Sequence, residues 1–160
     1  LAEGGRGEVT PVDLTALIQH CVQKLTPAAQ NAQVSISASG NDPVLISGDH
    51  ALLEEMLTNL LENGIKYNHA GGYVRARAEM ADGRAVVTVA DNGVGIAPED
   101  QQRVFERFYR VDKSRSKATG GTGLGLAIVK HIARIHNARI RLESEINVGT
   151  TITVCFETAH

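Results

Sequence analysis

The stretch LLEEMLTNLLENGIKYN, residues 52–68, organises the rest of the chain. At about 100° per residue it predicts one amphipathic helix with two distinct faces. The apolar face carries Leu53, Met56, Leu57, Leu60 and Leu61, and a narrow polar strip beside it carries Glu55, Asn59, Asn63 and Lys66. We therefore expect one face to build a core and the other to meet a polar partner.

The two asparagines of the polar strip need an explanation of their own. Asparagine is a poor helix-interior residue because its amide competes with the backbone for hydrogen bonds. A solvated helix face would explain the charged residues, but it leaves Asn59 and Asn63, one turn apart, without a reason. A bound ligand supplies one, because an amide oxygen suits Mg²⁺ and Lys66 can neutralise a phosphate.

Three further blocks follow this helix in the sequence. Asp91-Asn92-Gly93-Val94-Gly95-Ile96 ends an apolar run, Phe105-Glu106-Arg107-Phe108-Tyr109-Arg110 follows it, and GGTGLGLAIV, residues 120–129, opens another helical pattern. Either glycine motif alone is a weak signal. Together, in this order and spacing, the four blocks resemble the N box, first glycine box, F box and second glycine box of the ATP-binding catalytic domain of sensor histidine kinases. The resemblance covers nearly the whole chain.

Length and composition agree with a single domain. The 160 residues suffice for one core, and 42% hydrophobic and 21% charged residues are typical of a soluble globular protein. We expect a flexible segment over residues 1–8 and the catalytic domain over residues 9–160. A net charge of -2 gives no electrostatic reason to bind nucleic acid or an anionic membrane.

The cysteines and the amino terminus bear on the cellular location. Cys21 and Cys155 are expected to be small buried hydrophobes rather than a disulfide, which fits a reducing cytoplasm. No apolar run is long enough to span a bilayer, and residues 1–7 do not read as a signal sequence. The chain also begins without methionine, so we expect an excised domain. The resemblance implies the cytoplasmic part of a bacterial sensor kinase anchored in the plasma membrane.

Periodicity and turn signals predict the remaining elements. We expect a helix capped by Asp13, with a kink or restart at Thr26-Pro27, and a central helix capped by Asp49. Strands are expected over 34–37, 44–46, 73–80 and 85–90, a short helix over 98–105, a last helix over 124–136, and closing strands around 140–142 and 152–156. Residues 73–80 alternate wet and apolar side chains, with Met80 on the apolar side, so helices should cover one side of the sheet. The fold class is a two-layer α/β sandwich with a mixed, mostly antiparallel sheet, which the resemblance also implies (the Bergerat fold).

A long connection separates the short helix from the last helix. Residues 107–122 show no sustained apolar periodicity, and connections of this length inside a domain are usually functional or disordered. We interpret them as a mobile lid over the ligand. Arg107 and Arg110 lie here, beside Phe105 and Phe108, and are expected near the γ-phosphate or the docking partner. For Arg110, a basic surface loop is an equally good explanation.

The resemblance implies roles for the residues that match its motifs. Asn63 corresponds to the Mg²⁺ ligand with Asn59 assisting, and Lys66 and Tyr67 correspond to phosphate-contacting and base-stacking positions, although Tyr67 also fits an ordinary residue at the edge of the core. Asp91 corresponds to the acceptor for the exocyclic amine of adenine, and the alternative for it is a simple Asx-type turn. The other implied nucleotide contacts are Gly93, Gly95, Ile96, Gly121, Thr122, Gly123, Leu124, Gly125 and Thr150. Because the second glycine block precedes a helix, its backbone amides can cradle phosphates.

Two positions depart from the family pattern. Gly64 stands where alanine is usual, which should cost about 1 kcal/mol of helix propensity unless close packing requires glycine. Asn137-Ala138 replaces a pair of glycines after the last helix, so Asn137 is predicted to take the left-handed conformation that ends it. Neither position belongs to the implied chemistry.

The resemblance implies a protein-histidine kinase. The γ-phosphate of Mg-ATP would pass to a histidine on a dimerisation domain absent from this chain, and then to a response-regulator aspartate. No histidine here is followed by the acidic residue and Arg-Thr-Pro of the family's acceptor. We expect the isolated domain to be monomeric and the full-length protein to be a homodimer.

Two other functions remain open at this point. One is an ATPase or conformational switch like the gyrase, mismatch-repair and heat-shock-chaperone families. The other is a non-catalytic, ATP-dependent regulator of the anti-sigma type. Asn59 argues against hydrolysis, because related ATP-hydrolysing folds carry a glutamate there that activates water, and an amide has no such basicity.

Overall fold

The computed structural model describes residues 8–101, 103–105 and 125–157. The elements are β1 (Val9–Asp13), α1 (Leu14–Asn31), β2 (Ser35–Ser39), β3 (Leu45–Asp49), α2 (His50–Lys66), β4 (Tyr73–Ala81), β5 (Arg84–Asp91), α3 (Pro98–Gln101), α5 (Gly125–Ile135), β6 (Ala138–Glu145) and β7 (Gly149–Phe156). The predicted lid over 107–122 and nearly all of the predicted amino-terminal segment lie outside the described residues.

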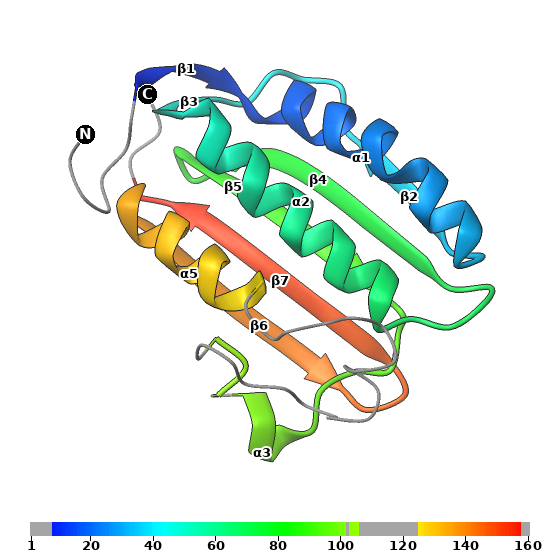
Figure 1. Ribbon diagram of the computed structural model, residues 1–160. Coiled ribbons are helices and arrows are strands. Elements are labelled where there is room, and N and C mark those ends of the chain that lie inside the picture. Colours follow the sequence, from blue (N-terminus) through cyan, green and yellow to red (C-terminus); the bar gives the residue numbers. More distant parts are fainter. Residues whose placement is uncertain (1–7, 102, 106–124, 158–160) are drawn as a thin grey trace.

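The domain has two layers. A five-stranded sheet has the order β2-β4-β5-β7-β6, in which β2 and β4 run parallel and the other pairs are antiparallel. Strands β1 and β3 form a separate antiparallel pair. Helices α1, α2 and α5 lie together on one face of the large sheet (Figure 1). The predicted sandwich with a mostly antiparallel sheet is confirmed.

Strand β4 shows why the helices cover a single face. Val74, Ala76 and Ala78 are buried against the helices, whereas Arg75 and Arg77 point to the open side. The alternation fails at Met80, which was expected on the apolar side but is 49% exposed. Met80 is next to the last residue of β4, at the hairpin, where the core no longer extends.

The helix caps follow the prediction. Asp13 accepts a hydrogen bond from the amide of Thr15 at 3.1 Å, and Asp49 accepts one from the amide of Leu52 at 3.2 Å. The possible restart at Thr26-Pro27 is wrong, because α1 continues through Pro27 to Asn31. Buried residues on both sides of the proline, Leu25 and Ala29, hold the helix to the core as one element.

Two element predictions need correction. Strand β1 was not predicted, although Val12 pairs with Ile46 of β3. Its sequence, VTPVD, holds a proline and a single buried residue, so it lacks the alternation that marks a strand. The helix expected over 98–105 ends at Gln101, and residues 103–105 form a turn.

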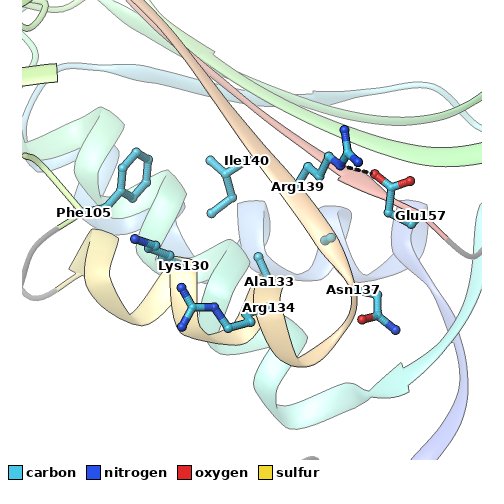
Figure 2. A pocket seen from close by; sticks show the side chains of 9 residues that line it. Phe105, Lys130, Ala133, Arg134, Asn137, Arg139, Ile140 and Glu157 are labelled. Carbon is cyan, nitrogen blue, oxygen red and sulfur yellow. Dashed lines mark ion pairs between the residues drawn. The ribbon is translucent and has the colours of Figure 1, made fainter. Parts of the chain in front are cut away.

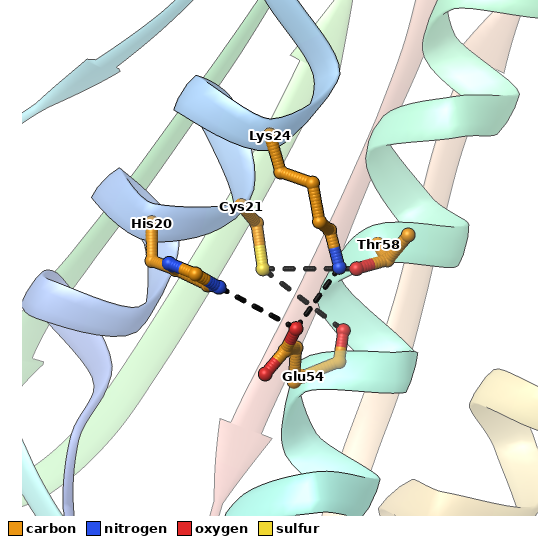
Figure 3. A network of polar contacts seen from close by, with 5 residues as sticks. All are labelled: His20, Cys21, Lys24, Glu54 and Thr58. Atoms are coloured by element: carbon orange, nitrogen blue, oxygen red, sulfur yellow. Dashed lines mark hydrogen bonds and ion pairs between the residues drawn. The ribbon is translucent and has the colours of Figure 1, made fainter.

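A polar network joins α1 to α2 at the edge of the core (Figure 3). Glu54 accepts a hydrogen bond from Lys24 Nζ at 2.9 Å and lies 3.5 Å from His20 Nε2. The hydrogen bond from Lys24 lowers the pKa of Glu54. Thr58 Oγ1 donates to Cys21 Sγ at 3.7 Å, and burial raises the pKa of this thiol. Cys21 and Cys155 are both free, as predicted, but only Cys21 is buried; the predicted burial of Cys155 is wrong, because this side chain lies half-buried.

Candidate nucleotide site

The carboxyl end of α2, the loop after β5 and the turn before β7 meet at one end of the sandwich. The amide of Val94 donates to the carbonyl oxygen of Tyr67 at 3.0 Å, and the amide of Asn147 donates to the carbonyl oxygen of Val94 at 2.9 Å. One loop residue therefore links the central helix to the β6–β7 turn. The amino end of α5 and the carboxyl end of α2 lie toward the same side of the domain (Figure 1).

Asp91 is the last residue of β5 and the acidic group of this region. Its Oδ1 accepts the amide of Gly93 at 2.8 Å, and its carboxyl also accepts the backbone amide of Thr150, its partner on β7. Burial nevertheless raises the pKa of Asp91 to about 6. The Asx-type turn considered from the sequence is therefore present, but a turn does not require a carboxylate at a buried position. The carboxyl has lone pairs left to accept a further hydrogen bond from a ligand.

The glycines of the loop are required by the protein's own backbone. A Cβ on Gly93 would collide with the carbonyl oxygen of Tyr67. Gly95 has a φ of 74° and lies against the carbonyl of Glu145, which leaves no room for a side chain. The loop is thus pressed between α2 and the end of β6, and Asp91 is held at its base.

Two asparagines that sequence reasoning left without a role support the same loop. The amide of Tyr73 donates to Asn92 Oδ1 at 2.6 Å, and Asn68 Nδ2 donates to the carbonyl of Tyr73 at 3.0 Å. His69 Nε2 lies 3.0 Å from the carbonyl oxygen of Asn92. In the sequence, Asn68 directly follows Tyr67 and Asn92 directly follows Asp91. This adjacency to predicted site residues was the one sequence feature that could have indicated their role.

Hydroxyl groups fix the far end of the loop. Ser144 Oγ accepts the amide of Ile96 at 2.8 Å and lies 2.7 Å from Thr150 Oγ1. Gln101 Nε2 donates to the carbonyl of Ile96 at 2.9 Å. Thr150, predicted to contact nucleotide, is therefore engaged by the protein through both its hydroxyl and its backbone amide. Ser144 and Gln101 were not predicted.

The polar strip of α2 faces no protein partner in the described part of the chain. Asn59 and Asn63 are both half-buried, and neither side-chain amide hydrogen bonds to a described residue. Lys66 is exposed and forms no ion pair with a described residue. Partly buried amides normally find partners. The strip is therefore available to a ligand with phosphate oxygens or a hydrated cation.

Of the remaining predicted site residues, some lie within the described part of the chain and others lie outside it. Gly125 begins α5, as expected for a glycine block that precedes a helix. The other members, Arg107, Arg110, Gly121, Thr122, Gly123 and Leu124, lie outside the described residues. Residues 8–101, 103–105 and 125–157 contain no group of three or more His, Cys, Asp or Glu side chains suited to a metal ion. No helix among them is long and apolar enough to cross a membrane.

The sandwich and the glycine loop anchored on its central helix define an ATP-binding domain of the Bergerat type. Residues 48–160 match the family model described as "Histidine kinase-, DNA gyrase B-, and HSP90-like ATPase". The chain belongs to this family, and ATP is the nucleotide that the fold serves.

Curated relatives place the chain nearer to one branch of that family. It is 44% identical over 147 residues to the sensor-like histidine kinase SenX3 of Mycolicibacterium smegmatis, covering 92% of this chain and 38% of the relative. It is 40% identical over 156 residues to the phosphate regulon sensor protein PhoR of Pseudomonas aeruginosa, covering 96% of this chain and 34% of the relative. The chain thus spans little more than a third of these proteins.

Solved structures agree with the fold. The mycobacterial sensor histidine kinase MprB superposes with a TM-score of 0.77 at 29% identity, covering 93% of this chain and 97% of that structure. Full-length ShkA in complex with AMPPNP superposes with a TM-score of 0.80 at 28% identity, covering 95% of this chain and 31% of that structure. The resemblance to sensor histidine kinase catalytic domains is confirmed.

Proposed function

We propose that this domain binds Mg²⁺-ATP and, within its whole protein, transfers the γ-phosphate to a histidine of a dimerisation domain. From that histidine the phosphate would pass to an aspartate of a response regulator. The proposal makes the domain the catalytic part of a protein-histidine kinase. It is supported by the similarity to SenX3 and PhoR over nearly all of this chain.

The observation that carries the proposal is the pair of half-buried amides on α2. Asn59 and Asn63 lie one turn apart on a helix whose carboxyl end holds the Asp91 loop through Tyr67. Burying the side-chain amides of Asn59 and Asn63 without a described hydrogen-bond partner lowers the stability of the fold. A bound ligand that hydrogen bonds to them would offset this cost. Phosphate oxygens and Mg²⁺ are the ligands that match amides and a nearby lysine.

The donor set suits Mg²⁺ coordinated mainly by phosphates and water. Asn63 would supply one hard oxygen ligand, and Asn59 would contact a phosphate or a coordinated water. Bound Mg²⁺ supplies charge neutralisation at the β- and γ-phosphates. Lys66, exposed at the end of α2, would contact a phosphate directly.

Asp91 would select adenine. Because its pKa is about 6, the carboxyl is mostly ionised at neutral pH and can accept the exocyclic amine of the base. Guanine carries a carbonyl there, which cannot donate to the carboxylate and would be repelled by it, so guanine binding would cost a few kcal/mol relative to adenine. Tyr67 and Ile96 would flank the base, while Gly93 and Gly95 keep the loop close to it.

The phosphate end of the site would use residues of the second glycine block and the F box. The amides of Gly121, Thr122, Gly123, Leu124 and Gly125 would cradle phosphates ahead of α5. Arg107 would stabilise charge developing on the transferred group, and Arg110 would contact phosphate or the partner. Asn59 cannot act as a base toward water, which favours transfer to a protein over hydrolysis.

The whole protein would bring further partners. We propose a dimerisation domain with the acceptor histidine, a cognate response regulator and a homodimeric assembly. We also propose that this domain works on the cytoplasmic side of a membrane-anchored sensor. These proposals rest on the similarity to named sensor kinases, of whose chains the matched regions cover 38% and 34%.

A phosphotransfer assay on the whole protein tests the function. With γ-labelled ATP and Mg²⁺, label should appear on a histidine outside this domain as an acid-labile, base-stable phosphate. Asn63→Ala should abolish labelling, whereas Arg77→Ala, an exposed change on the open face of the sheet, should not. Rapid phosphate release to water by the domain, without any labelled histidine, would show an ATPase instead.

A further inference from the structure

A cleft of about 610 Å³ opens away from the nucleotide site, between α5 and the edge strand β6. Its walls are Lys130, Ala133 and Arg134 of α5 on one side and Ala138, Arg139 and Ile140 of β6 on the other. Phe105 stands at one end, and the pair formed by Arg139 and Glu157 stands at the other (Figure 2). The volume lies within the range of ligand pockets, about 300–1,000 Å³.

The backbone of β6 faces this cleft with hydrogen-bonding groups that have no partner among the described residues. Antiparallel ladders alternate between residues that bond to the neighbouring strand and residues whose groups point away from it. The amide of Glu157 donates to the carbonyl of Asn137 at 3.1 Å, which sets the phase of the β6–β7 ladder. The N–H and C=O groups of Ala138, Ile140 and Leu142 therefore point outward.

A contact of Ser144 independently confirms which β6 residues direct their backbone groups away from β7. Ser144 is two residues beyond Leu142, and its carbonyl accepts the Gln101 side chain at 3.0 Å, on the side of β6 away from β7. Among the described residues, Gln101 covers the edge at Ser144 and not at Ala138, Ile140 or Leu142. Within the described residues, the stretch from Ala138 to Leu142 pairs with β7 and with no other strand. An uncovered edge of this kind is a template for another strand.

The charged side chains around the β6 edge favour a partner of negative charge. The cleft is lined by three cations, Lys130, Arg134 and Arg139, and by one anion, Glu157. Glu157 is already engaged, at 2.8 Å from Arg139 and 3.8 Å from Arg84. Lys130 and Arg134 form no ion pair with a described residue. In a chain of net charge -2, this is a local positive surface.

We propose that β6 and α5 form a docking site for an extended acidic segment of a partner protein, which adds to the sheet beside β6. Its backbone would pair with Ala138, Ile140 and Leu142, and its carboxylates would meet Lys130 and Arg134. Side chains on its inner face would contact Ile140 and Phe105. The inference does not depend on the kinase reaction, because no nucleotide contact is assigned to any of these residues.

The test uses an acetylated and amidated heptapeptide of alternating glutamate and valine, titrated into the protein. Amide resonances of Ala138, Ile140 and Leu142 should shift and exchange more slowly with solvent, and binding should weaken as salt rises. The same peptide with lysine in place of glutamate should bind at least about tenfold more weakly. The glutamate-valine peptide presents alternate N–H groups on its two edges, so two N-methylated versions are needed, one for each edge. N-methylation should abolish binding when it blocks the edge that pairs with β6 and should leave binding intact when it blocks the other edge.

Protein variants separate the two contributions. Ile140→Pro removes the outward N–H but no ladder bond, so it should abolish binding while Ile140→Ala retains it. Lys130→Glu with Arg134→Glu should weaken binding at least about tenfold, whereas Arg77→Glu on the open sheet face should not. ATP affinity should be unchanged in all of them, which also shows that they fold.

Three outcomes would overturn the proposal. The first is no resonance shift at millimolar peptide. The second is equal binding of the lysine peptide or of Ile140→Pro. The third is concentration-dependent dimerisation that Ile140→Pro abolishes, since this would assign the edge to a second copy of the chain.

Discussion

Gly64 of α2 lies directly against Val74 of β4, so that a Cβ on Gly64 would stand 2.9 Å from Val74 Cγ2 and 3.0 Å from Cγ1. The close packing that would justify glycine in the middle of this helix is therefore present. It brings the helix and the sheet together one residue after Asn63, the proposed Mg²⁺ ligand.

We predict that Gly64→Ala destabilises the domain. Helix propensity favours alanine by about 1 kcal/mol, but overpacking against a β-branched side chain costs about 1–3 kcal/mol, so the free energy of unfolding should fall. Urea unfolding measures it, with Glu55→Ala as the exposed control. In a Val74→Ala background, Gly64→Ala should instead raise the free energy of unfolding, because the clash is removed. A Gly64→Ala protein that is as stable as wild type would contradict the packing argument.

Asp91→Asn should stabilise the domain in a pH-dependent way. In the unfolded chain the carboxyl ionises near pH 3.8, but in the native state it ionises near pH 6, so the native state holds more protons between these values. Native stability therefore falls as pH rises through this window. The shift sets an upper bound of about 3 kcal/mol on the stability difference, and the difference should be smaller than this because the carboxyl is partly exposed.

Thermal or urea unfolding of Asp91→Asn and wild type from pH 3.5 to 8 measures this difference. The variant should be the more stable protein at pH 8, and the advantage should vanish below about pH 4, where both side chains are neutral. ATP affinity should fall in the same variant. A constant difference across the whole pH range would show that the burial of the charge is not responsible.

The sequence predicted those parts of the fold that depend on periodicity and local chemistry. Alternation on β4 and the apolar stripe of α2 fix which faces are buried, and Asp13 and Asp49 cap their helices through neighbouring amides. Such signals lie within a few residues of the elements they define. Strand β1 had no such signal, because its partner β3 lies some thirty residues away and its own sequence contains Pro11.

In the candidate site, too, residues in a contiguous or periodic pattern could be predicted, whereas residues brought in by long-range contacts could not. Asp91, Gly93 and Gly95 could be singled out as candidates because their motif is contiguous, and the polar strip on α2 could be singled out because its residues recur at helical spacing. Asn92, which fixes Tyr73 through its side chain, was part of the quoted motif but had no predicted role. Ser144 could not be found, since its contact with Ile96 spans 48 positions of the chain. Polar contacts across such distances follow from the packing of the sheet, and no local pattern encodes them.

Asn63→Ala should make ATP binding insensitive to Mg²⁺. The amide is half-buried without a described protein partner, so its removal should cost little stability, within about 0.5 kcal/mol. Calorimetric titration should show affinity lowered about tenfold or more in Mg²⁺ and little changed in a chelator. Lys66→Ala provides the contrast, because it should weaken binding under both conditions. Loss of affinity in chelator alone would place Asn63 elsewhere in the site.

The two thiols should differ in reactivity. Cys21 is buried between α1 and α2 and burial raises its pKa, so it should react with a thiol reagent only when the domain unfolds. Cys155 lies half-buried on the open face of β7 and should react in the native state. Timed alkylation with mass spectrometry resolves the two sites, and Cys155→Ser should leave only the slow, urea-dependent phase. Fast labelling of Cys21 in native protein would mean that α1 separates readily from α2.

Two residues with positive φ should respond differently to glycine. Asn137 ends α5 with a φ of 56°, and Gln33 follows α1 with a φ of 60°. The left-handed conformation costs most L-residues about 1–2 kcal/mol, but asparagine tolerates it. Gln33→Gly should therefore raise the free energy of unfolding by up to about 1 kcal/mol, whereas Asn137→Gly should change it by only a few tenths. Alanine at either position should be no better than the native residue, and equal gains from glycine at both would show that asparagine has no advantage here.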